Sequence, residues 1–165
     1  LFGLLAHATN PEAVARVFAI KGEGRRSPLP VLLPDRESLE KVSTGLPPSA
    51  IELVERGWPG PFTLIVPAKV DVLPSQLLAG RDTVAVRIPG PSPAYELLQA
   101  FTEPLTGTSA NLTGKPGVAS SDELDPAIAK AVDVVLPGVG AIGVASTIVD
   151  VTGDEPKVLR GDLRL

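Results

Sequence analysis

Eighteen of the 165 residues are proline, and they are spread along the chain between short apolar runs. This is about twice the ~5% share that proline has in ordinary proteins. Proline fixes the backbone and cannot donate a ladder hydrogen bond, so it favours loops over helix interiors and central strands. The spacing therefore predicts separate elements joined by stiff loops, and not a low-complexity tail.

Cysteine is absent, and His7 is the only histidine. The chain therefore has no disulfide framework, no thiolate metal site and no cysteine nucleophile. A single histidine also excludes a multi-histidine metal centre and leaves little room for a Ser-His triad. The net charge of −4 argues against a general nucleic-acid coat, although a local basic patch is compatible with it.

The length of 165 residues predicts one domain with a sizeable core. No run of about 18 apolar residues occurs, so no transmembrane span is expected. The segment before His7 is apolar but too short for a signal peptide and lacks a basic lead. The sequence therefore predicts a soluble, cytoplasmic protein that has no contact with a membrane.

Capping residues predict helices after Asn10-Pro11-Glu12, Asp35, Ser49 and Ser92-Pro93. Short apolar runs predict strands at 29–33, 62–66, 83–89, 105–108, 132–136, 147–151 and 157–159. Strands interleaved with helices are typical of a single α/β (or α+β) domain with one central sheet. We therefore expect residues 1–165 to form one such domain.

Arg87 is the one charged residue in the strand predicted at 83–89, and it shares a face with Thr83. Four residues of strand separate their Cα atoms by about 13 Å, a span that suits one ligand groove. An arginine on an edge strand that points to water explains the pattern equally well. The sequence leaves both interpretations open.

Two loops carry residues that could bind an anion. The first holds Lys21, Arg25 and Arg26 between a helix end and a strand, where it could hold phosphates or simply be a solvated loop. The second is 104–114, where the turn Ser109-Ala110-Asn111 follows a strand. Its amides and hydroxyls could bind an anion or a carbonyl group through hydrogen bonds, but ordinary turns use the same residue types.

Other polar residues are weaker candidates. Ser146 and Arg160 lie at the ends of two predicted strands, where a structural role is equally compatible with the pattern. For His7 a surface or capping role is the better interpretation, and Asp150 is more typical of a turn acceptor than of a metal ligand. The chain has no P-loop. An enzyme of this composition would therefore work by positioning and charge neutralisation, which suits nucleotide phosphates.

The order of six segments is more specific than any one of them. They are IKGEGRRSPLPVLL, WPGPFTLIVP, TVAVRIP, PLTGTSANLTGKP, STIVD and VLRGD. In this order they resemble the YrdC family of threonylcarbamoyl-AMP synthases, from Leu1 to about Arg160. The resemblance implies a twisted mixed sheet flanked by helices, with a concave basic cleft on one side.

The activity that the resemblance implies is nucleotidyl transfer. ATP, L-threonine and bicarbonate give threonylcarbamoyl-AMP and pyrophosphate, and magnesium arrives with the ATP. Transferase proteins downstream then use the product to modify an adenosine of certain tRNAs. The alternative is a non-catalytic module that binds tRNA or double-stranded RNA in translation or ribosome maturation. The net charge and the lack of an aromatic stacking platform weaken that alternative.

The resemblance also implies roles for single residues. On the ATP side it places Lys21, Arg25, Thr83, Ser109, Asn111 and Arg160. On the threonine side it places Arg87, Ser146 and Ser27, with the Arg87 guanidinium meeting the substrate carboxylate. Asn111 would either hold its turn or reach the ligand. No side chain is assigned as a general acid or base, and no residue as a metal ligand.

Two departures from the family pattern stand out. Glu23 occupies a position of the basic loop where the family usually has a second cation, so Arg25 or Arg26 would take over its role. Phe2-Gly3-Leu4 matches the end of the family's Thr-x-Tyr-Gly-Leu motif, with phenylalanine in place of tyrosine. The family's N-terminal strand, which carries that threonine, is accordingly expected to be missing from residues 1–165.

Overall fold

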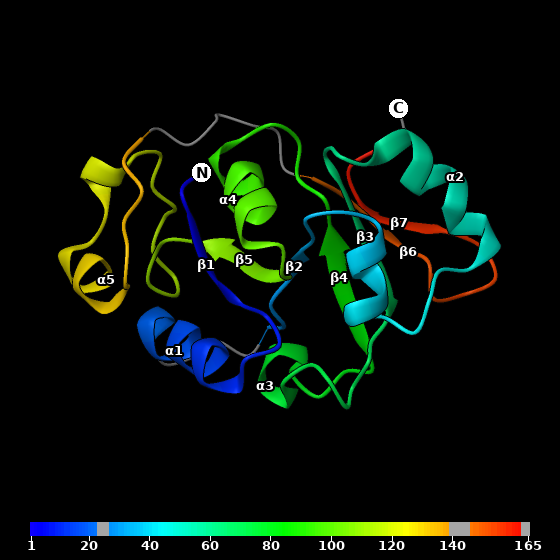
Figure 1. Cartoon of the computed structure of the whole chain (residues 1–165), viewed down its shortest axis with the longest axis horizontal. Coiled ribbons are helices and arrows are strands. Elements are labelled where there is room, and N and C mark those ends of the chain that lie inside the picture. Colours follow the sequence, from blue (N-terminus) through cyan, green and yellow to red (C-terminus); the bar gives the residue numbers. More distant parts are fainter. Residues whose placement is uncertain (23–26, 139–145, 163–165) are drawn as a thin grey trace.

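The computed structural model describes residues 1–22, 27–138 and 146–162. Within these residues the strands form one seven-stranded mixed sheet in the order β1-β5-β2-β4-β3-β6-β7. The strands are β1 (Gly3–His7), β2 (Val31–Leu32), β3 (Phe62–Pro67), β4 (Thr83–Arg87), β5 (Leu105–Ser109), β6 (Thr147–Asp150) and β7 (Lys157–Arg160). Figure 1 shows the sheet running across the molecule from β1 to β7. The predicted single domain with one mixed sheet flanked by helices is confirmed.

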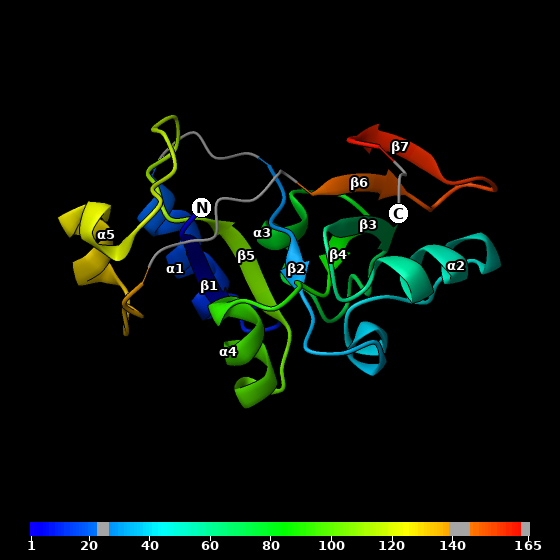
Figure 2. The same cartoon turned by 90° about the horizontal axis from the view of Figure 1, so that it is seen from above.

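Helices connect most of the strands. They are α1 (Pro11–Lys21), α2 (Pro48–Gly57), α3 (Ser75–Leu78), α4 (Pro93–Phe101) and α5 (Pro126–Ala131), with 3-10 turns η1 (Glu37–Lys41) and η2 (Ser121–Glu123). Seen from above (Figure 2), α4 and α2 lie on one side of the sheet, and β6 and β7 turn towards the other. Among the described helices, none is long and apolar enough to cross a membrane.

Two of the predicted helix starts are confirmed in atomic detail. Asn10 Oδ1 accepts hydrogen bonds from the amides of Glu12 at 2.9 Å and Ala13 at 3.1 Å, which would otherwise lack partners at the first turn of α1. Ser92 Oγ accepts from the Tyr95 amide at 3.2 Å at the start of α4. In both helices proline occupies the first turn, where its missing N–H costs nothing.

Strand directions define two ends of the sheet. β2 and β4 run parallel, and β5 runs antiparallel to β2, so β4 begins where β5 ends, at Ser109. β3 is antiparallel to β4 and parallel to β6. The strands β3 and β6 therefore begin where β4 ends, at Arg87. We call these the Ser109 end and the Arg87 end. Because β4 is paired on both sides, the interpretation of Arg87 as an edge-strand residue is wrong.

The two faces of the sheet differ in burial. Val84, Val86 and Leu64 are at most 2% exposed and belong to the main core. The core also takes in Val14 from α1 and Val54 from α2. Each such side chain contributes roughly 1.5–3 kcal/mol when it is removed from water. The opposite face carries Thr83, Ala85 and Arg87, which are only half-buried. The alternation predicted for 83–89 is therefore real, and it leaves Arg87 on the less covered face.

The strand predicted at 132–136 is wrong. No described strand pairs with this segment, and Val134 is 71% exposed. Its β-branched residues favour a strand only where a neighbouring strand offers partners. Asp133 is instead bound by Arg16 of α1, through Nη1–Oδ2 at 2.9 Å and Nη2–Oδ1 at 3.1 Å.

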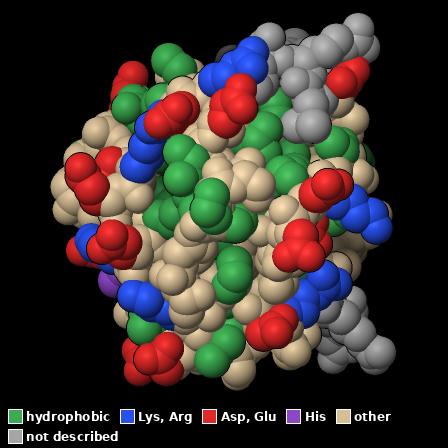
Figure 3. All heavy atoms as spheres, turned by 90° about the vertical axis from the view of Figure 1, so that its right-hand side faces the viewer, with side chains coloured by type: hydrophobic (Ala, Val, Ile, Leu, Met, Phe, Trp, Pro, Cys, Tyr) green, Lys and Arg blue, Asp and Glu red, His purple; other side chains and the backbone are tan. Residues whose placement is uncertain are grey.

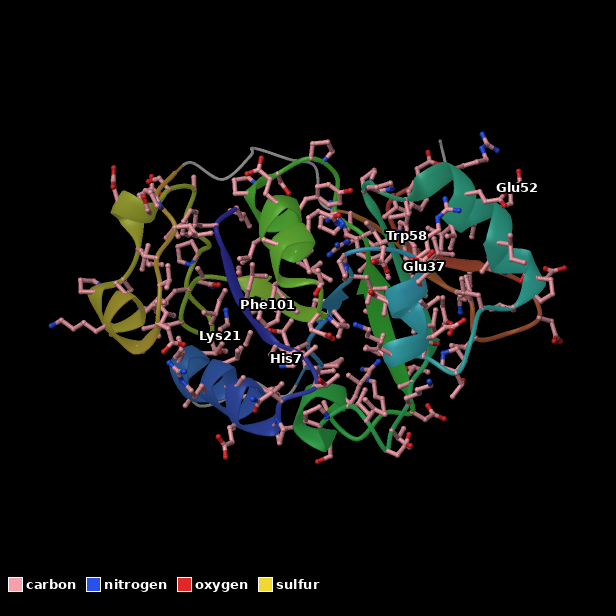
Figure 4. The ribbon with its side chains drawn as sticks, viewed as in Figure 1. His7, Lys21, Glu37, Glu52, Trp58 and Phe101 are labelled. Carbon is pink, nitrogen blue, oxygen red and sulfur yellow. The ribbon has the colours of Figure 1, made fainter. Side chains whose placement is uncertain are left out.

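Several boundaries also differ from the expectation. Of the run 29–33 only Val31–Leu32 pair as a strand, and the helix expected after Asp35 is the 3-10 turn η1. Ser49 lies inside α2, which begins one residue earlier. His7 ends β1, and its ring packs edge-on against Phe101 of α4, with centroids 5.5 Å apart. Figure 4 shows these two side chains next to each other.

β7 is an edge strand of the described sheet, and all four of its residues are exposed. Figure 3 faces this side of the molecule and shows apolar side chains among charges of both signs. The exposed apolar residues of α2 and β7 are Ile51, Val158 and Leu159. Lys157 and Arg160 stand at the two ends of β7, and charge on a short edge strand hinders pairing with another chain.

Candidate functional site

The candidate residues gather at the two ends of the sheet described above. At the Ser109 end, Lys21, Ser109 and Asn111 form what we call the Lys21 cluster. At the other end, Arg87 and Thr63 lie near Ser146 and Arg160, and we call these four the Arg87 cluster. About 13 Å of strand β4 separates the ends, measured from Thr83 to Arg87.

Lys21 is the last residue of α1 and is only 3% exposed. Its ammonium donates to the Ser109 carbonyl oxygen at 2.7 Å and to Asn111 Oδ1 at 2.9 Å. A buried charge is costly unless hydrogen bonds compensate it, so these contacts fix the lysine and the turn to each other. In Figure 4 Lys21 lies between α1 and the segment that follows β5.

The Asn111 amide is fully used within the chain. Its Oδ1 accepts from Lys21 Nζ and from the Ser109 hydroxyl, and its Nδ2 donates to the carbonyl oxygens of Leu112 and Lys115. An amide has two acceptor and two donor positions, and all four are filled. Of the two roles expected for Asn111, these contacts are those of holding the turn.

The same contacts determine whether the Ser109 hydroxyl can donate or accept a further hydrogen bond. Its only proton is donated to Asn111 Oδ1, so in this arrangement Ser109 Oγ can only accept further hydrogen bonds. A partner there must bring an O–H or N–H. An ionised phosphate oxygen has no such hydrogen, whereas a sugar hydroxyl or an amine does.

Two further candidates lie at this end, and two lie outside the described residues. Thr83 begins β4 opposite Pro67 and is half-buried. Ser27 is exposed and lies four residues before β2, on the segment that enters the sheet at this end, and its expected role in binding threonine stays a prediction. The candidates Arg25 and Arg26 lie outside the described residues, as does Glu23.

Arg87 ends β4 with its guanidinium fixed by one hydrogen bond. Its Nε donates to the Gly60 carbonyl oxygen at 2.8 Å, and Gly60 N donates to Ile88 O at 2.9 Å, which ties the loop to the strand. In the described part of the chain, both Nη groups of Arg87 lack a partner and form a fork suited to a carboxylate. Burial lowers the pKa of Arg87, but an arginine remains charged at any working pH.

Gly60 has a steric reason to be glycine. A Cβ added to it would lie 2.5 Å from the carbonyl oxygen of Gly57, a distance that requires the backbone to move. The carbonyl oxygen that holds Arg87 is therefore placed by a turn that tolerates no side chain at this position.

Ser146 lies immediately before β6 and receives two hydrogen bonds on its hydroxyl. Thr63 Oγ1 is 3.0 Å and Arg160 Nη2 is 3.2 Å from Ser146 Oγ. Arg160 Nε also donates to the Ser146 carbonyl oxygen at 3.0 Å. The structure thus places Arg160 with Ser146 at the Arg87 end, and not with the other residues expected to bind ATP.

Thr63 was not expected in the site. It is the only hydroxyl residue in the apolar run 62–66, and it is 6% exposed. Leu64 pairs with Val86, so one step further along the ladder Thr63 lies opposite Arg87 on the same face. A polar residue in an apolar strand was the signal used for Arg87, and it would also have identified Thr63.

No three His, Cys, Asp or Glu side chains of the described residues come together in a group that could hold a metal ion. The polar side chains at the two ends of the sheet offer groups for recognition. A guanidinium fork and a hydroxyl lie at one end of a sheet face, and a hydroxyl that only accepts lies at the other.

The chain belongs to the Sua5/YciO/YrdC family, whose family model, described as "Telomere recombination", matches residues 1–161. Over 97% of its length it is 36% identical to a threonylcarbamoyl-AMP synthase of Pyrococcus abyssi and 38% identical to one of Bacillus subtilis. It covers 47% and 46% of those proteins, so the chain spans about half the length of these curated relatives. The family resemblance found in the sequence is confirmed.

A solved structure agrees with this assignment. The crystal structure of P. abyssi Sua5 complexed with L-threonine matches this chain with a TM-score of 0.83 at 36% identity. The match covers 96% of this chain and 46% of that one. The concave basic cleft and the missing N-terminal strand, which the resemblance also implies, stay predictions.

Proposed function

We propose that this protein is a nucleotidyltransferase that forms threonylcarbamoyl-AMP and pyrophosphate from ATP, L-threonine and bicarbonate. One observation carries the proposal: 97% of the chain aligns with two proteins named threonylcarbamoyl-AMP synthase, at 36% and 38% identity. The polar residues at the two ends of the sheet supply groups that suit such substrates.

The Arg87 cluster is proposed to bind L-threonine. The two Nη groups of Arg87 can donate in parallel to both oxygens of a carboxylate, and the bond to Gly60 O orients the fork. Ser146, with Thr63 and Arg160 beside it, lies at the same end of the sheet. A pre-oriented fork loses little freedom on binding, so this end of the sheet suits a small amino acid.

The Lys21 cluster is proposed to bind the nucleotide. Ser109 Oγ can accept from a ribose hydroxyl or from the adenine amino group, and Lys21 holds the turn that presents it. Thr83 lies at the same end, and Arg25 of the basic loop is proposed to meet the phosphates. Arg160 projects from the opposite end, where we propose that it faces the phosphates next to the amino acid.

The reaction we propose has three steps. Bicarbonate takes up a proton and loses water to give carbon dioxide. The threonine amine then adds to the carbon atom, so that an N–C bond forms as one C–O π bond breaks, and it releases a proton to water to leave a carbamate. A carbamate oxygen then attacks the α-phosphorus of ATP. The new O–P bond forms as the bond from the α-phosphorus to the bridging oxygen breaks, and pyrophosphate leaves with magnesium as part of the substrate. Arginine and backbone donors stabilise the developing charge, and no side chain is needed as a general base.

Further expectations from the sequence stay predictions. They are the use of the product by downstream threonylcarbamoyl-transferase proteins, direct binding of tRNA or double-stranded RNA, and a cytoplasmic location. The non-catalytic RNA-binding alternative has less support, because the relatives are named as synthases.

The test is pyrophosphate release from magnesium-ATP, measured on the full gene product with and without L-threonine and bicarbonate. Mass spectrometry would identify threonylcarbamoyl-AMP. Release that needs both co-substrates, with the adduct present, is the expected result. Release that ignores threonine, or no release from a folded protein that still binds RNA, would reject the proposal.

A further inference from the structure

We infer that Thr63 is a positioning residue that fixes the Ser146 hydroxyl as a hydrogen-bond donor towards an oxygen of the bound amino acid. The inference rests on the proposed function, because it concerns the same end of the sheet. Thr63 does not touch the substrate itself and acts only through Ser146.

The hydrogen bond between the Thr63 and Ser146 hydroxyls has a defined direction. Thr63 is 6% exposed, and its Oγ1 lies 3.0 Å from Ser146 Oγ, its one side-chain hydrogen bond in the described residues. If Ser146 donated to Thr63, the threonine proton would be left without an acceptor in a buried place. Leaving a buried donor unpaired is costly, so Thr63 donates and Ser146 accepts.

The Ser146 hydroxyl keeps its proton for a further partner. Its hydroxyl oxygen has two acceptor positions and one proton. Thr63 fills one acceptor position, and Arg160 Nη2 fills the other at 3.2 Å. Among the described residues nothing accepts the Ser146 proton. The hydroxyl is therefore fixed as a donor, and a partner must offer an oxygen lone pair.

Thr63 relates the position of the Ser146 donor to that of Arg87. Thr63 lies beside Arg87 on one face of neighbouring strands, where Cβ atoms are about 5 Å apart. Ser146 is half-buried beyond Thr63, so an amino acid held by the Arg87 fork comes next to it. An ammonium group, which offers only hydrogens, is rejected at this position, whereas a carboxylate or hydroxyl oxygen is accepted. The Thr63–Ser146 pair thus helps to select which end of the amino acid faces Ser146.

The test compares Thr63→Val, which keeps the shape and removes the hydroxyl, with Thr63→Ser, which keeps the hydroxyl. We expect Thr63→Val to raise the KM for L-threonine about five- to tenfold, the size of one lost hydrogen bond. The kcat and the KM for ATP should change less than about twofold, and Thr63→Ser should restore the KM for threonine.

A matched control removes another buried threonine hydroxyl. Thr106 of β5 is 0% exposed and accepts from the Ala6 amide at 3.1 Å, away from the Arg87 cluster. Thr106→Val should lower the melting temperature and leave the KM for threonine unchanged. An equal rise in that KM in Thr106→Val, or no rise in Thr63→Val, would overturn the inference.

A second measurement needs no turnover and so separates this inference from the proposed function. Side-chain couplings of labelled serine in NMR should show one χ1 rotamer for Ser146 in the parent protein and averaging in Thr63→Val. If the parent has no synthase activity but shows this change, the proposed function fails and the positioning of Ser146 stands. If the rotamer is the same in both, the inference fails whatever the activity.

Discussion

Lys21 Nζ lies 2.9 Å from Asn111 Oδ1 and joins the last residue of α1 to the turn after β5, 90 residues along the chain. The two residues lie on different elements, so the hydrogen bond links the turn to the end of α1. The family resemblance implies that Lys21 lies on the ATP side. In the structure Lys21 holds the turn in which Ser109 presents its hydroxyl.

Lys21→Met tests this relationship, because it keeps a chain of similar length and removes the charged donor. The Ser109 carbonyl and Asn111 Oδ1 would each lose a charged partner, a change that costs about 1.5–3 kcal/mol. We expect the free energy of unfolding to fall by about 2 kcal/mol and the KM for ATP to rise about tenfold. Lys115→Met, at an exposed lysine, is the matched control for denaturation and kinetics. An unchanged KM for ATP would show that the turn takes no part in nucleotide binding.

Arg87→Ala should remove the guanidinium fork and leave the fold intact, since Arg87 is only half-buried and makes one hydrogen bond. We expect the KM for L-threonine to rise about 10- to 100-fold, as charged hydrogen bonds are worth about 1.5–3 kcal/mol. Arg87→Lys should rescue little, because an ammonium cannot donate to both carboxylate oxygens in parallel. Arg81→Ala, at an exposed arginine just before β4, should behave as the parent protein. Parent-like threonine dependence in Arg87→Ala would reject Arg87 as the carboxylate ligand.

Gly60→Ala should weaken threonine binding without touching a side chain of the site. The new Cβ would lie 2.5 Å from Gly57 O, so the loop that holds the Arg87 guanidinium must shift. We expect a rise in the KM for threonine and a lower melting temperature. Gly153→Ala is the control, because its Cβ would meet nothing closer than 4.0 Å. If both variants kept the parent KM, Gly60 would have no part in orienting Arg87.

The ion pair between Arg16 and Asp133 predicts a pH dependence. Hydrogen bonding to Arg16, and then its charge, holds the pKa of Asp133 below its ordinary value. A carboxyl group with a lowered pKa in the folded state stabilises that state above its unfolded pKa, and the contribution is lost as pH falls through the folded pKa. Arg16→Leu should therefore raise the pKa of Asp133, as measured by carboxyl NMR titration. Because both side chains are exposed, added salt should reduce the shift in the parent protein, and an equal pKa in both proteins would contradict the ion pair.

The sequence was sufficient to predict the elements whose signals are local. The caps Asn10 and Ser92 and the alternation over 83–89 needed only neighbouring residues, and the structure has all three. β1 was missed and 132–136 was overpredicted, because a strand depends on a partner that lies far along the chain. β1 has that partner in β5, whereas 132–136 has none among the described strands.

The candidate site shows the same division. Arg87 and the Ser109–Asn111 turn could be singled out from their residue types. The position of Arg160 beside Ser146 could not, since it depends on the antiparallel pairing of β6 and β7 and on a register shift within it. Which atom donates to which, as in Ser109 and Ser146, requires the full set of contacts of each hydroxyl.

The interior position of β4 also has a mechanical consequence. A strand that is paired on both sides can neither lengthen nor slide without breaking its hydrogen bonds to both neighbouring strands. The pairing of β4 with β2 and β3 therefore keeps the distance between Thr83 and Arg87 constant. Inserting two residues into β4 would preserve the alternation of its faces and move the two polar ends apart by about 6.6 Å. A molecule can therefore contact both ends at once only if its length matches this fixed separation.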